Sequence, residues 1–335
     1  MFATLLEQLH RRQDLTEGQA SAAMAEIMDG RALPSQIAAL LIALSMKGER
    51  PSEIVGLARA MRERAVTVRA PGDVVDTCGT GGDRAETFNV STIAALVVAA
   101  CGLKVAKHGN RSVSSRCGSA DVFECLGVRI DAPPATVERS LDHAGIAFLF
   151  APTFHPSMKH AGPTRRELGV RTAFNLLGPL TNPARASRQL VGVPRPELTE
   201  LVARALGMLG SERAWVVHGA DGLDEISTTG YTKVSETRDG AVRTFYLHPT
   251  DVGIPKAAAA ALKGGEPEVN ATIARRLLGG ERGAARDIVT FNAAAVLMIA
   301  ERARSLREGI AVAAEALDSG AAAAVLDRLV AESHA

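Results

Sequence analysis

A glycine-rich segment between Asp76 and Thr92 holds the residues with the clearest chemical purpose in this sequence. Glycines stand at positions 79, 81 and 82, and because they lack a Cβ atom, backbone N–H groups there can close around a bulky ligand. The segment leads into an apolar run, Ile93 to Ala100, that predicts a helix. A helix N-terminus carries unpaired N–H groups and a partial positive charge, which suits a phosphate. Asp83 would repel a lone anion, so we expect a ligand that combines phosphate, metal and sugar.

A second polar cluster runs from Lys107 to Ser119 and follows a predicted strand at 104–107. In open α/β sheets, ligands bind beyond the carboxyl ends of strands, so the two clusters should share one crevice. Lys107 supplies a charge for phosphate, and the serines and loop N–H groups supply further donors. The alternative is a polar surface loop with helix-capping serines. The glycine segment one strand earlier favours the binding interpretation.

Adjacent carboxylates form a third cluster at Asp224 and Glu225, after a predicted strand that begins at Ala214. Magnesium takes a few carboxylates together with phosphate oxygens of its ligand, so this pair suits a magnesium site. An Asp-Gly turn with solvated acids is the alternative and is common. The metal interpretation gains weight because a pyrophosphate-bearing ligand would need a metal.

A fourth signal is Arg165, which is followed by Arg166 and Glu167. An arginine fork can hold a carboxylate through two hydrogen bonds. From spacing alone, a solvated helix face or an interdomain ion pair is the better interpretation of such a triplet.

Several familiar active-site patterns are missing from the sequence. His155 and His160 do not form HExxH, so zinc is disfavoured. There is no Walker GxxxxGK[ST] motif, and the third glycine of a GxGxxG motif would fall at Arg84. No GxSxG elbow indicates a serine hydrolase.

The elements that must position these clusters fall into two regions. Residues 1–66 have helical spacing throughout, with a capping-box pattern at Thr16 and Gln19. From about residue 73, short β-like runs alternate with helical runs, which predicts a parallel sheet with right-handed crossovers. Asp239-Gly240 between alternating runs predicts a β-hairpin over 231–247. Residues 155–185 interrupt the alternation, as a helical excursion would, and the tail from about residue 270 is helical.

Bulk composition excludes several classes of protein. The chain has 335 residues, 47% hydrophobic and 22% charged, with a formal net charge of +1, so no global field recruits nucleic acid or a membrane surface. No apolar run approaches the roughly 20 residues that span a bilayer, and the first residues lack a secretory pattern. The four cysteines show no CxxC pairing, which indicates free thiols in a reducing compartment. We therefore expect a cytoplasmic protein without nucleic-acid or membrane partners.

Together the motifs closely resemble those of the anthranilate phosphoribosyltransferase family of tryptophan biosynthesis. The matching runs, in chain order, are Gly79-Thr-Gly-Gly-Asp83, Asn89-Val-Ser-Thr92, Lys107-His-Gly-Asn-Arg111, Arg165-Arg-Glu-Leu-Gly169, Phe174-Asn-Leu-Leu-Gly-Pro-Leu-Thr-Asn-Pro183 and Asp221-Gly-Leu-Asp-Glu225. Two mild departures are Cys117, where serine is expected, and Thr164, where a β-branched apolar residue is usual.

The resemblance implies a small all-helical domain and a larger α/β domain with a mainly parallel central sheet, as in nucleoside phosphorylases. The helical domain would comprise residues 1–68 plus the excursion near 160–187 and form a homodimer. The α/β domain would comprise residues 73–335 less that excursion. The interdomain cleft would need Mg²⁺ and transfer the 5-phosphoribosyl group of phosphoribosyl pyrophosphate to the amine of anthranilate, giving N-(5-phosphoribosyl)anthranilate and pyrophosphate.

The resemblance also assigns roles to residues. Substrate-binding residues would be Gly79, Gly82, Asp83, Thr87, Asn89, Val90, Ser91, Thr92, Lys107, His108, Gly109, Asn110, Arg111, Ser112, Val113, Ser114, Ser115, Ser119 and Arg165. Ser91, Asp224 and Glu225 would serve magnesium. Arg165 would hold the carboxylate of anthranilate with Asn110 beside it, and Gly79 would face the amine.

No single catalytic acid or base is expected, because the anilinic nitrogen is already neutral at pH 7. Two alternatives stay open. A nucleoside phosphorylase would use inorganic phosphate and would not need Asp224 and Glu225. A nucleic-acid-binding homologue would need a broad basic face, which the net charge disfavours.

Overall fold

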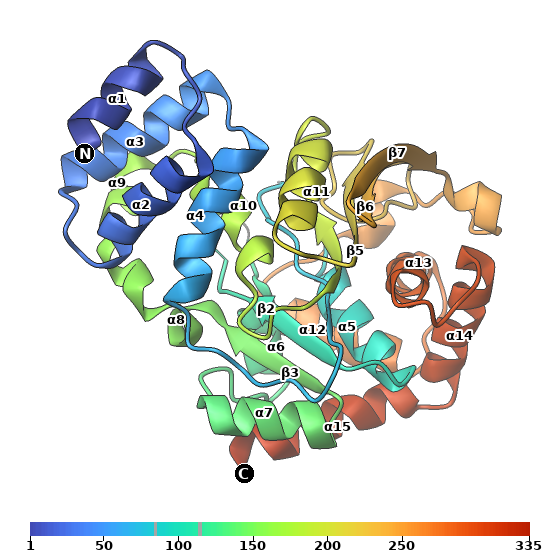
Figure 1. Cartoon of the computed structure of the whole chain (residues 1–335). Helices are drawn as coiled ribbons and strands as arrows, with labels where there is room; N and C mark the ends of the chain where they lie inside the picture. Colours follow the sequence, from blue (N-terminus) through green and yellow to red (C-terminus); the bar gives the residue numbers. More distant parts are fainter. Residues whose placement is uncertain (84–85, 113–115) are drawn as a thin grey trace.

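The computed structural model describes residues 1–83, 86–112 and 116–335. The chain begins with four helices that gather at one end of the molecule (Figure 1). They are α1 (Phe2–His10), α2 (Glu17–Met28), α3 (Pro34–Lys47) and α4 (Pro51–Glu63). The predicted capping box is confirmed: Thr16 Oγ1 accepts the N–H of Gln19, and Gln19 Oε1 accepts the N–H of Thr16.

A later part of the chain returns to this helical region. The returning elements are α8 (Ala151–Phe154), η1 (Pro156–His160), α9 (Gly162–Leu168), α10 (Phe174–Leu177) and η2 (Pro179–Thr181). Among them, α9 packs on α3, η1 on α2, and α10 with η2 on α4. The predicted excursion is therefore present, and it brings Arg165 to the side of the N-terminal helices.

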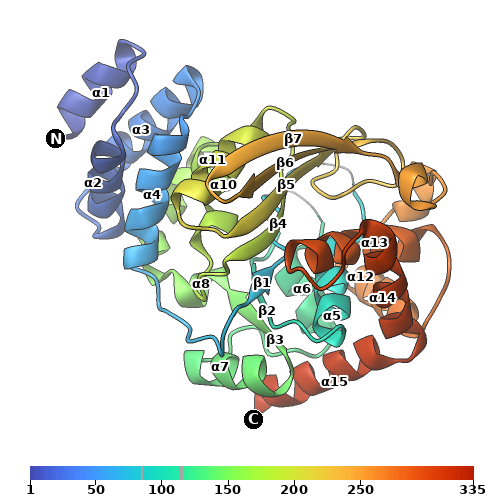
Figure 2. The same cartoon turned by 45° about the vertical axis from the view of Figure 1, so that its right-hand side comes forward.

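A single seven-stranded sheet forms the centre of the larger region (Figure 2). Its order is β3-β2-β1-β4-β5-β6-β7, with parallel pairing from β3 to β5 and antiparallel pairing of β5 with β6 and of β6 with β7. The strands are β1 (Val75–Asp76), β2 (Val105–Gly109), β3 (Ile146–Phe150), β4 (Arg188–Gly192), β5 (Arg213–Gly219), β6 (Thr232–Arg238) and β7 (Ala241–Leu247). The predicted parallel sheet and the hairpin at Asp239-Gly240 are confirmed, and both turn residues have positive φ, as a primed hairpin turn requires.

Two layers cover the sheet, because successive side chains of a strand point to opposite faces. In β5, Trp215 and Val217 pack with one hydrophobic cluster, while Ala214 and Val216 pack with the cluster that includes the N-terminal helices. The first face is covered by α5 (Val90–Ala100), α6 (Ser119–Cys125), α12 (Pro267–Leu278), α13 (Ala284–Ile299), α14 (Leu306–Asp318) and α15 (Ala321–His334).

The second face is covered by α11 (Leu198–Met208) and, near β3, by α7 (Pro134–His143). Because α11 also packs on α4, the core of the helical region continues onto the sheet. The strand predicted at 74–77 is shorter than expected: the carbonyl oxygen of Thr77 accepts the Lys107 ammonium instead of extending the ladder.

No single described helix is long and apolar enough to cross a membrane. The pair α14 and α15 would pass together by length and composition, but the two helices are bent by 66°. Their apolar side chains, such as Ala313, Leu317 and Leu329, are buried in the core.

Candidate active site

The predicted clusters meet at the carboxyl ends of the parallel strands. The glycine segment follows β1, the segment from Lys107 follows and overlaps the end of β2, and Asp224 and Glu225 follow β5. The remaining cluster lies on the helical side, where Arg165 belongs to α9. This edge of the sheet is where open α/β folds bind ligands.

The glycine segment is joined directly to the carboxylate pair. Asp224 Oδ2 accepts the N–H of Gly81 at 2.8 Å, and Glu225 Oε1 accepts the N–H of Ser91 at 3.0 Å. A Cβ atom on Gly79 would lie 2.7 Å from Asp224 Oδ2, so the close approach of the two segments requires glycine there. Segments far apart in the chain thus form one unit, as the sequence predicts.

Asp224 and Glu225 are half-buried, and their desolvation raises the pKa of both carboxyls above the ordinary range. The charge of Asp83 raises the pKa of Asp224 further, and the charge of Asp224 does the same for Glu225. Neither forms an ion pair with a basic side chain among the described residues. A buried pair of this kind favours a bound cation, because a cation would offset the charge repulsion.

The donor set is consistent with magnesium supplemented by a ligand. Asp224, Glu225 and the Ser91 hydroxyl are hard oxygen donors, which magnesium prefers. Within residues 1–83, 86–112 and 116–335, no three His, Cys, Asp or Glu side chains are arranged to hold a metal by themselves. Magnesium commonly keeps waters and phosphate oxygens, so an incomplete protein set is expected for it.

Lys107 lies beneath the glycine segment rather than in the open crevice. Its side chain is 2% exposed, and its ammonium donates to the carbonyl oxygen of Thr77 at 2.7 Å. Its charge favours the ionised forms of both Asp76 and Glu225 and so opposes the effect of burial on their pKa values. Lys107 therefore acts as a counter-charge between two buried carboxylates, and its contact with a donor phosphate stays a prediction.

Two histidines that the sequence did not connect lie side by side. The rings of His108 and His155 are 5.2 Å apart, and both are buried. Burial lowers the pKa of His108 to about 3 and that of His155 to about 4, so both rings are neutral at pH 7. His108 Nδ1 donates to the carbonyl oxygen of Gly178 at 2.9 Å, which leaves Nε2 as a bare acceptor. Nε2 of each ring is buried without a hydrogen-bond partner among the described residues.

Arg165 is half-buried, and desolvation lowers the pKa of its guanidinium. The guanidinium lies over the ring of Phe174, 4.9 Å from the centroid. In the part of the chain that the structure describes, Arg165 has no carboxylate partner. A desolvated arginine of this kind is suited to a planar carboxylate ligand.

Two further residues at the crevice carry no sequence signal that could have identified them. Nη1 of Arg171 lies only 1.7 Å from where a Cβ atom of Gly82 would stand, so this arginine rests on the glycine segment. Asn270 of α12 donates from Nδ2 to Asn89 Oδ1 at 2.8 Å. Both contacts depend on tertiary structure alone.

The other predicted substrate residues lie at the same edge, but they differ in whether their side chains or only their backbone groups are available to a ligand. Val90 and Thr92 are buried, so only their backbone could reach a ligand. The Arg111 guanidinium pairs with Asp121 and Glu124, so a donor contact would need its backbone or the loss of those pairs. The remaining members at this edge are Thr87, Gly109, Asn110, Ser112 and Ser119. Val113, Ser114 and Ser115 lie outside the described residues.

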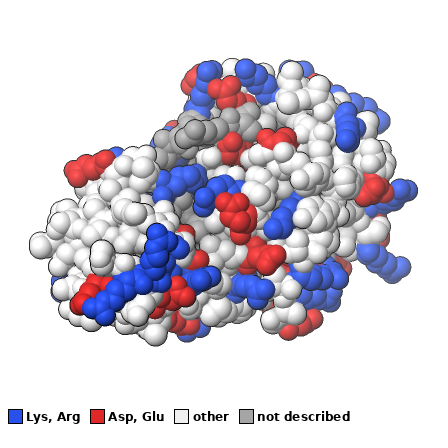
Figure 3. Space-filling model, turned by 90° about the horizontal axis from the view of Figure 1, so that it is seen from above, with Lys and Arg blue, Asp and Glu red and all other residues white. Residues whose placement is uncertain are grey.

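Charged side chains on the upper face of the molecule are mixed in sign (Figure 3). Lysine and arginine are interspersed with aspartate and glutamate over the described residues of this face. The view therefore gives no support for a broad basic surface of the kind that nucleic-acid binding uses.

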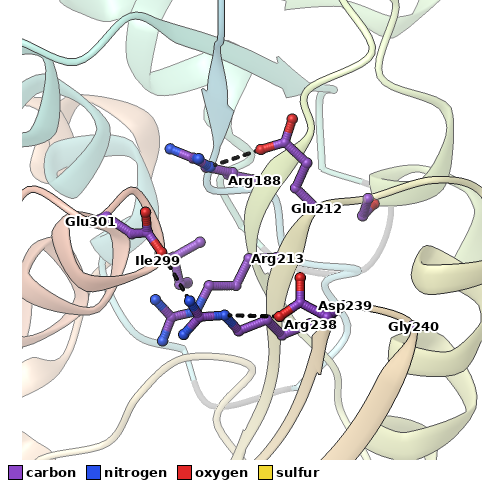
Figure 4. A pocket seen from close by; sticks show the side chains of 9 residues that line it. Arg188, Glu212, Arg213, Arg238, Asp239, Gly240, Ile299 and Glu301 are labelled. Atoms are coloured by element: carbon purple, nitrogen blue, oxygen red, sulfur yellow. Dashed lines mark hydrogen bonds and ion pairs between the residues drawn. The ribbon is translucent and has the colours of Figure 1, made fainter.

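A separate cavity of about 240 Å³ lies at the opposite end of the strands (Figure 4). Arg188 and Arg213 open β4 and β5 there, and Arg238 closes β6. Each arginine meets a carboxylate: Arg188 pairs with Glu212, Arg213 with Glu236 and Arg238 with Glu301. The cavity is therefore lined by matched charges.

Comparisons with known proteins agree on one family. The helical-bundle domain of a glycosyl transferase family matches residues 3–65, and the a/b domain of the glycosyl transferase family matches residues 71–323. Anthranilate phosphoribosyltransferase of Moorella thermoacetica is 58% identical over 320 residues, which cover 95% of this chain and 94% of the relative. The enzyme of that name from Symbiobacterium thermophilum is 54% identical, over 98% of this chain and 97% of its own.

Solved structures give the same result. The crystal structure of anthranilate phosphoribosyltransferase from Thermus thermophilus has a TM-score of 0.93 and 48% identity, over 98% of this chain and 99% of that one. The Saccharomyces cerevisiae enzyme in complex with PRPP and Mg has a TM-score of 0.91 and 28% identity, over 99% and 98% of the two chains. A further structure of the yeast enzyme, with 4-fluoroanthranilate, has a TM-score of 0.88 and 28% identity, over 100% and 99% of the two chains.

Proposed function

Because the chain belongs to the anthranilate phosphoribosyltransferase family, we propose that it transfers the 5-phosphoribosyl group of phosphoribosyl pyrophosphate to the amine of anthranilate. The products are N-(5-phosphoribosyl)anthranilate and pyrophosphate, in a step of tryptophan biosynthesis. One observation carries the proposal. The carboxylates of Asp224 and Glu225 accept N–H groups of the glycine segment, and the helical excursion that carries Arg165 reaches the same segment where Arg171 lies against Gly82.

The donor side is assigned to the glycine segment and the segment from Lys107. The yeast relative crystallised with PRPP and Mg supports this assignment. Backbone N–H groups of the glycine segment bind phosphate oxygens, apart from those of Thr80 and Gly81, which donate to Gly192 and Asp224, and Asp83 accepts from the ribose hydroxyls. Asp224, Glu225 and Ser91 hold Mg²⁺, which when bound supplies positive charge to the pyrophosphate.

The acceptor side is assigned to Arg165, Asn110 and the two buried histidines. Arg165 binds the carboxylate of anthranilate, and the relative crystallised with 4-fluoroanthranilate supports an acceptor of this shape. His108 supports the acceptor side indirectly, because its neutral ring holds the carbonyl oxygen of Gly178. Gly79 and Asn110 complete the acceptor side.

The reaction then requires orientation more than proton transfer. The bond between the anomeric carbon and the pyrophosphate oxygen breaks, the bond from that carbon to the amine nitrogen forms, and the nitrogen releases one proton to solvent. Holding amine and anomeric carbon in line can supply several powers of ten in rate. His108 is too weak a base to remove a proton at pH 7, since burial lowers its pKa to about 3. We therefore assign no catalytic acid or base.

The assembly and location of the enzyme are part of the same proposal. We propose two domains: a helical domain of residues 1–68 plus the excursion near 160–187, and an α/β domain of residues 73–335 less that excursion. We also propose that the helical domain forms a homodimer and that the enzyme acts in the cytoplasm. Leu33 and Met46 of the α3 region support the dimer, because they are 60% and 73% exposed although apolar. Light scattering of the wild type and of a Met46→Glu variant tests it: a monomeric wild type would refute the dimer.

Product formation tests the function directly. The purified chain, given anthranilate and phosphoribosyl pyrophosphate, should form the adduct with Mg²⁺ and lose this activity with a chelator. Replacing anthranilate by a nucleoside and inorganic phosphate tests the nucleoside phosphorylase alternative. Turnover of the nucleoside without anthranilate activity would overturn the proposal.

A further inference from the structure

The turn that enters β4 is fastened to several parts of the molecule at once. Three consecutive carbonyl oxygens, those of Gly178, Pro179 and Leu180, each accept a hydrogen bond from a different element. The donors are His108 Nδ1 of β2 at 2.9 Å, Gln189 Nε2 of β4 at 2.8 Å and Arg62 Nε of α4 at 2.6 Å. The turn therefore connects the helical region to the strands of the crevice.

Asn182 completes this turn with an amide that is buried and fully hydrogen-bonded. Its Nδ2 donates to Asp76 Oδ2 and to the carbonyl oxygen of Ala106, each at 2.8 Å. Its Oδ1 accepts the N–H of Ala184 at 2.9 Å. One side chain thus joins the turn to both β1 and β2.

Asp76 is a buried carboxylate that the proposed reaction does not use. It ends β1, just before the glycine segment, and its Oδ1 accepts the N–H of His108 at 3.3 Å. Burial raises its pKa to about 6, while the charge of Lys107 and the hydrogen bonds from Asn182 and His108 lower it. A buried carboxylate is costly unless it is hydrogen-bonded, so Asp76 depends on these donors.

We infer that the Asp76–Asn182 pair is a positioning joint that sets the acceptor-side turn against the donor-side strands. Both side chains are buried, so the pair acts through His108, whose backbone N–H donates to Asp76 and whose Nδ1 donates to the carbonyl oxygen of Gly178. The inference rests on the proposed function, because it assigns donor and acceptor to the two sides of this joint. A misplacement of about 1 Å between reacting groups can cost about 100-fold in rate.

Three variants test the joint. In Asp76→Asn the amide has one acceptor oxygen for two N–H donors, so one donor loses its partner. In Asn182→Asp two carboxylates face each other. The double variant Asp76→Asn/Asn182→Asp restores one donor–acceptor pair with the polarity reversed, but like Asn182→Asp it sets a carboxylate oxygen against the carbonyl oxygen of Ala106, so it is compared with that single variant.

Each single variant should lower kcat/KM for anthranilate by about 10- to 100-fold and change the dissociation constant of phosphoribosyl pyrophosphate with Mg²⁺ by less than about threefold. The double variant should recover at least about fivefold in kcat/KM over Asn182→Asp, and its unfolding midpoint should fall by less than the sum of the two single losses. Glu53→Gln is the matched control, because Glu53 is a buried carboxylate that accepts the N–H groups of Leu15 and Arg50 far from the crevice. It should lower the unfolding midpoint without changing kcat or either KM.

Single variants that lose only thermal stability, as the Glu53→Gln control should, would overturn the inference. So would equal losses in donor and acceptor affinity, or a double variant no better than the worse single variant. A wild type that forms no adduct would instead contradict the proposed function. In that case the unfolding midpoints still test whether Asp76 and Asn182 are coupled. If the double variant loses as much stability as the two single variants together, the pair is not coupled and the inference is wrong.

Discussion

The two ends of the central sheet both carry clusters of charged residues, but the carboxylates Glu236 at one end and Asp224 and Glu225 at the other have different partners. At the amino end, Arg213 donates to Glu236, which also accepts from Trp215 and Arg243. Burial would raise the pKa of Glu236, yet these hydrogen bonds hold it below the ordinary value. At the carboxyl end, Asp224 accepts the N–H of Gly81 and Glu225 that of Ser91, and neither is in an ion pair with a basic side chain among the described residues, so desolvation raises their pKa values.

This difference in partners distinguishes a cluster that stabilises the fold from one that binds a ligand. A matched buried ion pair is satisfied by the fold and needs no ligand, whereas uncompensated buried charge lowers stability until a partner arrives. Perturbed groups of this second kind cluster at functional sites. The sign of the pKa shift therefore distinguishes two clusters that look alike in the sequence as scattered acids and arginines.

The largest expected effect is on the unpaired carboxylates. Asp224→Asn with Glu225→Gln should lower turnover by at least about 1,000-fold, because the charge that holds Mg²⁺ is removed. The same variant should unfold at a higher temperature than the wild type when neither is given ligand or metal, since the repulsion between the two desolvated carboxyls is gone. Steady-state kinetics and calorimetry measure the two effects. Retained turnover would show that the metal assignment is wrong.

The paired cluster should behave in the opposite way. Arg213→Met leaves the Glu236 carboxylate without its buried partner and should lower the free energy of unfolding by about 3 kcal/mol. Both Michaelis constants and kcat should stay within about twofold of the wild type, since core changes away from an active site act mainly on stability. Urea unfolding and kinetics check this, and Arg213→Met with Glu236→Gln should recover part of the loss. A large loss of kcat/KM in Arg213→Met would contradict the assignment of this cluster to stability rather than function.

A variant of Arg165 tests whether this arginine binds the acceptor, anthranilate. Arg165→Ala should raise KM for anthranilate by about 100-fold, equivalent to about 2.7 kcal/mol, because a buried charge-assisted contact is lost. The KM for phosphoribosyl pyrophosphate should change by less than about threefold. Its exposed neighbour provides the control: Arg166→Ala should leave both constants unchanged. Equal increases for both substrates would contradict the assigned role.

The smallest effect concerns the neutral histidines. The folded-state pKa values of His108 and His155, about 3 and about 4, lie below the unfolded value of about 6.5. Between these values the unfolded chain binds more protons, so stability is complete above about pH 6.5 and falls as the pH is lowered, by up to about 1.4 kcal/mol per unit for each ring.

Urea unfolding between pH 7 and 5 measures this loss of stability. In His155→Gln the slope of the free energy of unfolding against pH should be smaller by the contribution of one proton. In His10→Gln, a variant of an exposed histidine, the slope should not change. An unchanged slope in His155→Gln would show that this ring is not held neutral by the fold.

Much of the fold follows from local sequence. The capping box at Thr16, the apolar run of α5 and the Asp-Gly hairpin are decided by neighbouring residues, so the sequence predicts them correctly. The union of Asp224 with the glycine segment is also predictable, because parallel strands place their carboxyl ends together.

What the sequence does not predict depends on burial and on distant partners. Lys107 looks like an exposed phosphate ligand in the sequence, yet it lies beneath the glycine segment and bonds to Thr77. The guanidinium of Arg111 turns to two carboxylates of α6. The contact of His155 with His108 joins two distant parts of the chain and has no motif. Such contacts are set by how the layers pack, which local patterns do not contain.

The far end of the glycine segment is closed by residues from much later in the chain. Thr87 pairs with Lys263 as an antiparallel bridge, Phe88 donates to the carbonyl oxygen of Leu262, and Gly264 donates to that of Glu86. During synthesis on the ribosome, the N-terminal helices can fold first, while the donor pocket waits for a segment made about 175 residues after it. Chains that terminate before that segment would keep a folded helical bundle but lack donor binding. Only chains synthesised beyond this segment, into the last quarter of the sequence, would therefore be active.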